Sequence, residues 1–155
     1  MGRAGAAIRI SDLVKGAKET IRALPFKKGG KTQGLGVYRD ARIHLVNSGN
    51  KAVDDDLWRI ANERLREVGI RRGSATSATA SDVEQKFVAM MIRDKVNKAE
   101  VVINNPSGPC RQPMGCDAVL NTMLGERQLR VHWPNGRGGF TSHLYGNGNV
   151  GMGGR

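Results

Sequence analysis

Residues 82–133 alternate between helical and strand patterns, and this alternation limits the fold more than any other feature of the chain. The stretch AEVVIN at 99–104 is short and apolar, and helical patterns flank it at 82–97 and at 116–124. QLRVHW at 128–133 is the next strand pattern. A strand that is apolar throughout is typical of the buried centre of a sheet. The pattern predicts a sheet that is covered by helices, with 99–104 near its centre.

With the remaining segments, the expected order along the chain is one helix, two strands, two helices, one strand, one helix and two strands. LGVYRDARIHLVNSG at 35–49 reads as a β-hairpin with its turn at 39–42. Two further helices are expected at 12–23, with Ser11 as N-cap, and at about 54–68, and a last strand at 138–146. The inward face of the first helix contains the apolar residues at helical spacing, Leu13, Val14, Ala17, Ile21 and Leu24.

A hairpin followed by this alternation predicts an α/β fold in which helices cover a mixed sheet. Phe87, Val88, Met91 and Val96 are expected to form the buried face of helix 82–97. The length of 155 residues suits one domain spanning 1–155. We expect residues 1–9, apart from Ile8, and the glycine-rich residues 147–155 to be flexible.

The charge of the chain points to a polyanionic partner. The formal net charge is +11, and the excess of Lys and Arg lies in residues 1–50 and 126–155, whereas 51–125 is nearly neutral. Nucleic acid is the commonest polyanion that basic domains bind. Candidate phosphate contacts are FKKGGK at 26–31 and Arg71–Arg72. No apolar run is long enough for a membrane span, and the N-terminus lacks the apolar block of a signal peptide.

The stretch ASDVEQKF at 80–87 has two interpretations. Ser81 and Glu84 match the capping box of an ordinary helix. Asp82 and Glu84 also match the pairing of a metal ligand with a proton shuttle at a helix start, as in zinc deaminases. The residues alone leave both interpretations open.

Two cysteines add to the second interpretation. Cys110 ends the loop after strand 99–104, and Cys116 opens the next helix. Two cysteines are too few for a disulfide scaffold, but the pair could form one small disulfide or remain reduced. Together with Asp82 they offer zinc two thiolates and a carboxylate. His44, His132 and His143 are alternatives to Asp82, and their spacing favours none of them.

Several segments together resemble a known family. These are GGKTQGLGVYRDARIHLVNSG, SDVEQKFVAMMIRD, AEVVINNPSGPC, GCDAVLNTML and LRVHWPNG. Their sequences and order resemble the bacterial toxin deaminases of the DddA type, a branch of the cytidine deaminase superfamily. The resemblance covers roughly residues 28–145. It implies a three-layer α/β/α sandwich with a five-stranded mixed sheet, and one zinc ion.

The resemblance also assigns roles to residues. It makes Glu84 the proton shuttle and Asp82, Cys110 and Cys116 the zinc ligands, with the fourth position left to water. Its substrate-binding residues are expected in two Gly- or Asn-containing segments and in the loop between the cysteines, namely Ser48, Gly49, Asn104, Asn105, Arg111 and Met114.

Two features depart from the family pattern. Asp82 stands where the family usually has His, and an extra negative charge would make the zinc a weaker Lewis acid. Five residues separate the cysteines where two are commoner in the superfamily. The longer loop brings Arg111 and Met114 to the lip of the pocket, where Met114 could fill the gap that a flipped base leaves.

The resemblance implies zinc-dependent hydrolytic deamination of cytosine to uracil in single- or double-stranded DNA. Such domains are typically toxins of secreted or injected antibacterial effectors, which act in the cytoplasm of a target cell and are neutralised by an immunity protein. We expect a monomer that has no membrane partner. The alternatives are a deaminase of RNA or nucleotides, and a non-catalytic basic domain that binds nucleic acid.

Overall fold

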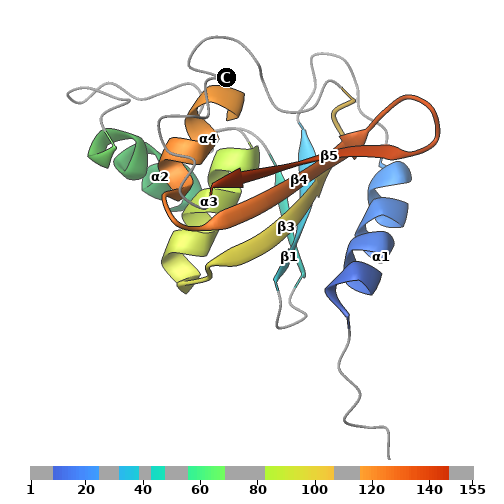
Figure 1. The fold of residues 1–155 in the computed structure, drawn as a ribbon, viewed down its shortest axis with the longest axis horizontal. Helices are drawn as coiled ribbons and strands as arrows, with labels where there is room; N and C mark the ends of the chain where they lie inside the picture. Colours follow the sequence, from blue (N-terminus) through green and yellow to red (C-terminus); the bar gives the residue numbers. More distant parts are fainter. Residues whose placement is uncertain are drawn as a thin grey trace, which may run out of the picture.

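The fold is taken from a computed structural model that describes residues 9–24, 32–38, 43–47, 56–68, 83–106 and 116–146. For residues 43–47, 58 and 116–119 it describes only the main chain. The elements follow the predicted order along the chain (Figure 1). They are α1 (Ile10–Arg22), β1 (Gln33–Tyr38), β2 (Ile43–Asn47), α2 (Asp56–Glu67), α3 (Val83–Asp94), β3 (Lys98–Ile103), α4 (Cys116–Leu124), β4 (Gln128–Pro134) and β5 (Phe140–Gly146).

The strands form one mixed sheet in the order β2-β1-β3-β4-β5. β1 pairs antiparallel with β2 and β3, β3 pairs parallel with β4, and β4 pairs antiparallel with β5. The predicted hairpin at 35–49 and the central position of the apolar strand are confirmed. The apolar run of β3 lies in its second half, at 101–103, where the sheet is covered on both of its faces.

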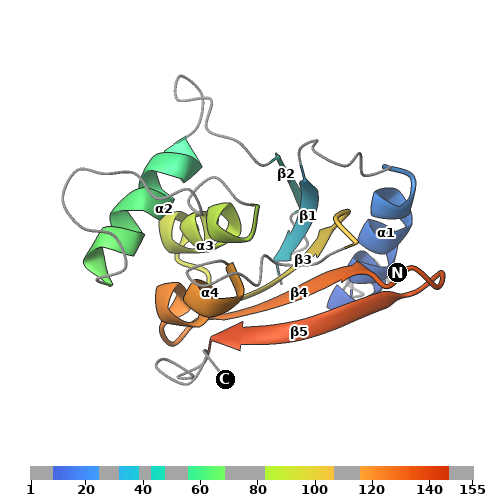
Figure 2. The same ribbon diagram turned by 90° about the horizontal axis from the view of Figure 1, so that it is seen from above.

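Helices cover both faces of the sheet. α1 lies on one face, and α3 and α4 lie on the other with α2 packed outside α3 (Figure 2). The alternation of β3 follows this division, since Val102 packs with Ile21 of α1 while Val101 and Ile103 belong to the core under α3 and α4. The expectation of a mixed α/β fold with helices against a mixed sheet is confirmed.

α1 buries the face that its spacing predicts. Val14, Ala17 and Ile21 are buried, and the remaining predicted residues of this face are half-buried. The helix nevertheless begins earlier than predicted. Arg9 is the N-cap, and its carbonyl accepts hydrogen bonds from Asp12 and Leu13, so Ser11 is not the cap. The earlier start brings Ile10 into contact with the α1-side core.

α3 is buried on all sides, whereas the sequence pattern predicts a single buried face. Every residue from Val83 to Met91 is buried, polar side chains included. The reason is its position between the sheet and the two helices α2 and α4 (Figure 1). The helix ends three residues before the predicted Asn97, because Lys95 adopts a positive φ of 57° and Val96 N–H bonds to Met91 O at 2.9 Å.

Two predictions about the whole chain stay predictions. Flexibility is expected at 1–9 and 147–155, and all of these residues except Arg9, the N-cap of α1, lie outside the described residues. The FKKGGK segment and Arg71–Arg72 also lie outside them. Of the two tryptophans, Trp133 is buried in the core, and the side chain of Trp58 is outside the description. No helix in the described ranges has the length and apolar character that crossing a membrane requires.

Candidate functional site

The first turns of α3 and α4 lie at one edge of the sheet. α3 ends at Asp94, just before β3 begins, and α4 follows β3 and ends at Leu124, just before the parallel strand β4 begins. Both helices therefore run opposite to β3 and β4 (Figures 1 and 2), and α3 begins beside the carboxyl end of β3. Ligands of α/β proteins bind most often at this edge.

The sheet holds α3 closely at both ends. A Cβ on Gly34 would lie 2.6 Å from Val83 Cγ1 and 3.3 Å from Ile103 Cγ2, so the start of α3 rests on the glycine backbone beside the end of β3. At the other end, Tyr38 Oη donates a hydrogen bond of 3.0 Å to the Asp94 carboxylate. These contacts fix the helix that carries Glu84.

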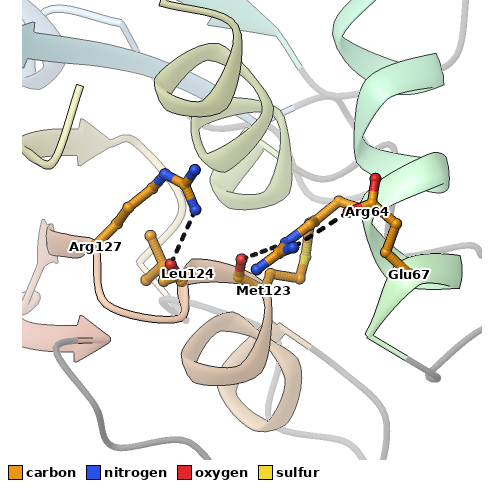
Figure 3. Close-up of polar contacts among 5 residues, drawn as sticks. All are labelled: Arg64, Glu67, Met123, Leu124 and Arg127. Atoms are coloured by element: carbon orange, nitrogen blue, oxygen red, sulfur yellow. Dashed lines mark hydrogen bonds and ion pairs between the residues drawn. The ribbon is translucent and has the colours of Figure 1, made fainter. Parts of the chain in front are cut away.

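A second set of contacts holds the C-terminal end of α4. Arg64 of α2 donates from Nε to Met123 O at 2.9 Å, and Arg127 donates to Leu124 O at 3.3 Å (Figure 3). Gly125 has a φ of 63° and closes the helix. Because main-chain carbonyls at a helix C-terminus lack partners within the helix, these donors stabilise α4. They thereby hold in place the helix that begins at Cys116.

Glu84 is the predicted catalytic residue that the structure describes in full. It lies in the first turn of α3 and is 4% exposed. The partial positive charge at a helix N-terminus favours a carboxylate there. Ser81, the other residue of the predicted capping box, lies outside the described residues.

The predicted metal ligands are described only in part. The main chain of Cys116 opens α4, whereas Asp82 and Cys110 lie outside the described residues. No group of three or more His, Cys, Asp and Glu side chains that could hold a metal occurs within the described part of the chain. Four predicted substrate-binding residues are also outside it, namely Ser48, Gly49, Arg111 and Met114.

Asn104 and Asn105 follow β3 at the edge where α3 and α4 begin. Asn104 is 4% exposed, and its amide accepts a hydrogen bond from Gln33 N at 2.9 Å and donates one to Leu24 O at 3.2 Å. Asn105 Nδ2 donates to Thr32 Oγ1 at 3.4 Å. The Asn104 side chain therefore joins the end of α1 and the start of β1 to the loop that leads to the cysteines.

We expect Asn104→Ala to lower the free energy of unfolding by about 1–3 kcal/mol, because it leaves the Gln33 amide and the Leu24 carbonyl without their partner. Chemical denaturation of the purified variant measures this loss. Asn97→Ala removes the same side chain at an exposed position and should change the stability by less than about 0.5 kcal/mol. Equal stabilities of the two variants would contradict a structural role for Asn104.

His132, one of the alternative metal ligands, lies away from the start of α3. It is 5% exposed, and its Nε2 lies 2.7 Å from Glu100 Oε1 on the α1 face of the sheet. α3 packs against the opposite face, so His132 does not approach the first turn of α3. His143 is exposed on the edge strand β5, where its ring contacts Tyr145, and only the main chain of His44 is described.

The burial of two polar residues of α3 and the pairing of Glu100 with His132 could not be predicted from the sequence pattern. Gln85 and Lys86, next to Glu84, are both buried. Helical periodicity places them away from the core, and nothing local distinguishes them from exposed polar residues. The pairing of Glu100 with His132 depends on the register of β3 and β4, in which Val102 is opposite His132.

The chain matches the model of a known protein family. No curated protein sequence matches it. A family model described as SCP1.201-like deaminase matches residues 11–148. The matched range contains Glu84, both cysteines, and nearly all of the described helices and strands. Because the match extends over most of the chain, the protein belongs to the family of SCP1.201-like deaminases.

Proposed function

We propose that the protein is a zinc-dependent hydrolase that converts cytosine to uracil in DNA. The observation that carries this proposal is that Glu84 is buried in the first turn of α3, and that α3 packs against α4, the helix that Cys116 opens. Both helices run opposite to β3 and β4, in a chain that belongs to a deaminase family. Deamination needs a proton carrier beside the site of water attack, and Glu84 is suited to this role.

The proposed ligands fit zinc by their chemistry. Asp82, Cys110 and Cys116 would supply one carboxylate and two thiolates, and zinc accepts both kinds of donor. The start of α4 favours the thiolate of Cys116, because the helix N-terminus carries partial positive charge. Three protein ligands leave one position open, as in catalytic zinc sites. When bound, zinc would supply a water molecule that loses its proton near neutral pH.

In this proposal Glu84 moves the protons. It takes a proton from the attacking water, whose oxygen forms a bond to C4 of cytosine. It then gives that proton to the ring nitrogen N3. As the bond from C4 to the amine breaks, Glu84 takes the remaining proton from the new C4 hydroxyl and passes it to the amine, which leaves as ammonia while the C4 carbonyl of uracil forms. The burial of Glu84 at 4% exposure suits this role, because a water-poor site strengthens the interaction of the carboxylate with the reacting atoms.

A polymeric substrate follows from the charge of the chain. A net charge of +11 attracts the phosphates of a nucleic acid far more strongly than a free nucleoside. The C4 atom of a paired cytosine is not accessible to such a site, so the base must come from a single strand or be flipped out of a duplex.

The deciding experiment offers the protein single-stranded DNA, double-stranded DNA, RNA of the same sequence, and free cytidine. Sequencing of the polymers and chromatography of the nucleoside score cytosine-to-uracil conversion. We expect conversion in DNA. Conversion in RNA or cytidine alone would replace the proposed substrate, and no conversion together with no zinc would leave a basic nucleic-acid-binding domain.

Metal analysis tests the ligand set separately. We expect about one zinc per chain in the purified protein and its loss in Asp82→Ala and Cys116→Ala, because each removes a direct ligand. His143→Ala serves as the control and should keep the metal, since this ring contacts Tyr145 on the edge strand. Full zinc retention in Asp82→Ala would exclude Asp82 as the third protein ligand.

We also propose that the domain acts as a toxin in the cytoplasm of a bacterial cell and that a cognate immunity protein blocks it. Expression of the domain in bacteria should arrest growth and raise the frequency of C-to-T mutations, because uracil pairs as thymine. Growth arrest without these mutations would point to another target.

A further inference from the structure

A cavity at the carboxyl edge of the sheet lies beside α1, and Glu84 is not among its described lining residues. It has a volume of about 280 Å³ and lies between the end of α1, the segment after β3, and the loop from β4 to β5. Arg22, Asn104, Pro106 and Phe140 are among its lining residues. Residues at the end of α1 line it, and α1 lies on the face of the sheet opposite to α3 and α4 (Figure 2).

The β4–β5 loop is held in one conformation. Asn135 Oδ1 accepts hydrogen bonds from Arg137 N at 2.8 Å and from Gly139 N at 3.2 Å. Gly136 and Gly138 have φ values of 78° and 85°, which other residues rarely adopt. The loop therefore presents the exposed Arg137 from a fixed backbone.

α1 brings two further cations to this loop. Arg22 donates to Gly138 O at 2.9 Å, and its Cζ lies 5.6 Å from the centroid of the Phe140 ring. Lys18 Nζ lies 5.5 Å from the same centroid. Cations are attracted to the faces of aromatic rings, so Phe140 holds both near the cavity. We call Lys18, Arg22, Arg137 and Phe140 the α1–loop surface.

The charge of the α1–loop surface is strongly positive. The loop from Pro134 to Phe140 has no acidic residue, and Glu19 is the only acidic residue between Gly16 and Arg22. Arginine guanidinium groups bind phosphate oxygens through paired hydrogen bonds, so such a surface suits a phosphate backbone.

We propose that the α1–loop surface binds the phosphates of a single strand of DNA that continues beyond the target cytosine. This inference rests on the proposed polymeric substrate and assigns a path to the strand. A cavity of about 280 Å³ is at the small end of ligand pockets, so it admits one nucleotide of a strand and not a duplex. Asn104 and Pro106, at the end of β3, connect this path to the edge where α3 and α4 begin.

The test measures binding without turnover. Fluorescence anisotropy with a labelled oligothymidine, which contains no cytosine, gives the affinity at several salt concentrations. We expect Arg22→Gln with Arg137→Gln to weaken binding by at least about tenfold, because two charge-assisted contacts are lost. The slope of log affinity against log salt should fall by about 0.7 for each lost contact.

Matched variants test whether the position of the two lost charges matters, or only their number. Arg59→Gln with Arg66→Gln removes the same charge from α2, on the opposite side of the sheet, and should keep most of the affinity. Arg137→Gln alone should still lower the salt slope, since its exposed side chain is not part of the Arg22 contact. Thermal melting establishes that each variant is folded.

The outcomes separate this inference from the proposed function. If the wild-type protein deaminates DNA and the loop variants bind oligothymidine with an unchanged salt slope, the strand path is wrong and the function stands. If the wild-type protein neither binds nor deaminates DNA, both fail. Displacement of the oligonucleotide by poly-glutamate at equal charge would make the surface a site for an acidic protein and overturn the proposal.

Discussion

Glu84→Gln should abolish uracil formation while the protein keeps its fold and its zinc. The amide has nearly the same shape as the carboxylate, but it cannot accept the proton of the attacking water or return it to the substrate. Loss of general acid–base catalysis lowers rates by about 10²- to 10⁴-fold, so we expect at least a hundredfold decrease in turnover. Single-turnover deamination of a cytosine-containing oligonucleotide, followed by cleavage at uracil, measures the decrease.

Two controls support the interpretation of this variant. Glu126→Gln makes the same chemical change at an exposed position and should leave the rate unchanged. The melting temperature and the zinc content of Glu84→Gln should match those of the parent protein. A variant that is folded and loaded with zinc but deaminates within a few-fold of the parent would remove Glu84 from the mechanism.

Gly36→Ala should strongly destabilise the protein, although it adds only one methyl group. A Cβ on Gly36 would overlap the ring of Phe87, a fully buried residue of α3. Overpacking a filled core costs about 1–3 kcal/mol, and the overlap at Gly36 argues for the upper part of this range. The melting temperature should fall by about 5–10 °C in thermal denaturation, since each kcal/mol shifts a domain of this size by about 2–4 °C.

The opposite change is expected at Gly16. Nothing lies within 4 Å of a Cβ there, and Gly16 occupies the interior of α1. Gly16→Ala should therefore stabilise the protein by about 0.5–1 kcal/mol through helix propensity.

The loss of stability in the double variant Gly36→Ala with Phe87→Leu should be smaller than the sum of the losses in the two single variants, because the smaller side chain makes room for the methyl group. Strict additivity would show that the two residues do not meet.

The tight contact between α3 and β1 also bears on activity. Gly34 and Gly36 let α3 approach the sheet, and Val83 at the start of α3 rests on Gly34. A shift of this helix moves Glu84, which follows Val83 directly. We expect the proposed deamination to be sensitive to a shift of Glu84 by about 1 Å, because catalysis depends on positioning at that scale.

Much of the fold follows from the local pattern of the sequence. Spacing of apolar residues predicts α1, and a continuous apolar run predicts β3, because the periods of helix and strand differ and each depends only on neighbouring residues. The ends of elements were less predictable. Lys95 ends α3 with a positive φ that lysine rarely adopts, and no residue near it marks that stop.

The candidate site could be predicted in part for the same reason. Glu84 at a helix start and Cys116 at the next helix start are recognisable in the sequence, and the order of elements places both at one edge of the sheet. The environment of Asn104 could not be predicted, since its partners Gln33 and Leu24 are far away along the chain.

The sequence by itself determined the order of helices and strands, the basic character of the chain and the residues that can perform proton transfer, because these depend on local periodicity and on side-chain chemistry. Only the tertiary structure decided that α3 is buried on all sides and that His132 lies away from it. It also decided that Arg22 meets Gly138 and Phe140. Such contacts join residues that are distant in sequence, and they depend on how the sheet and its helices pack together.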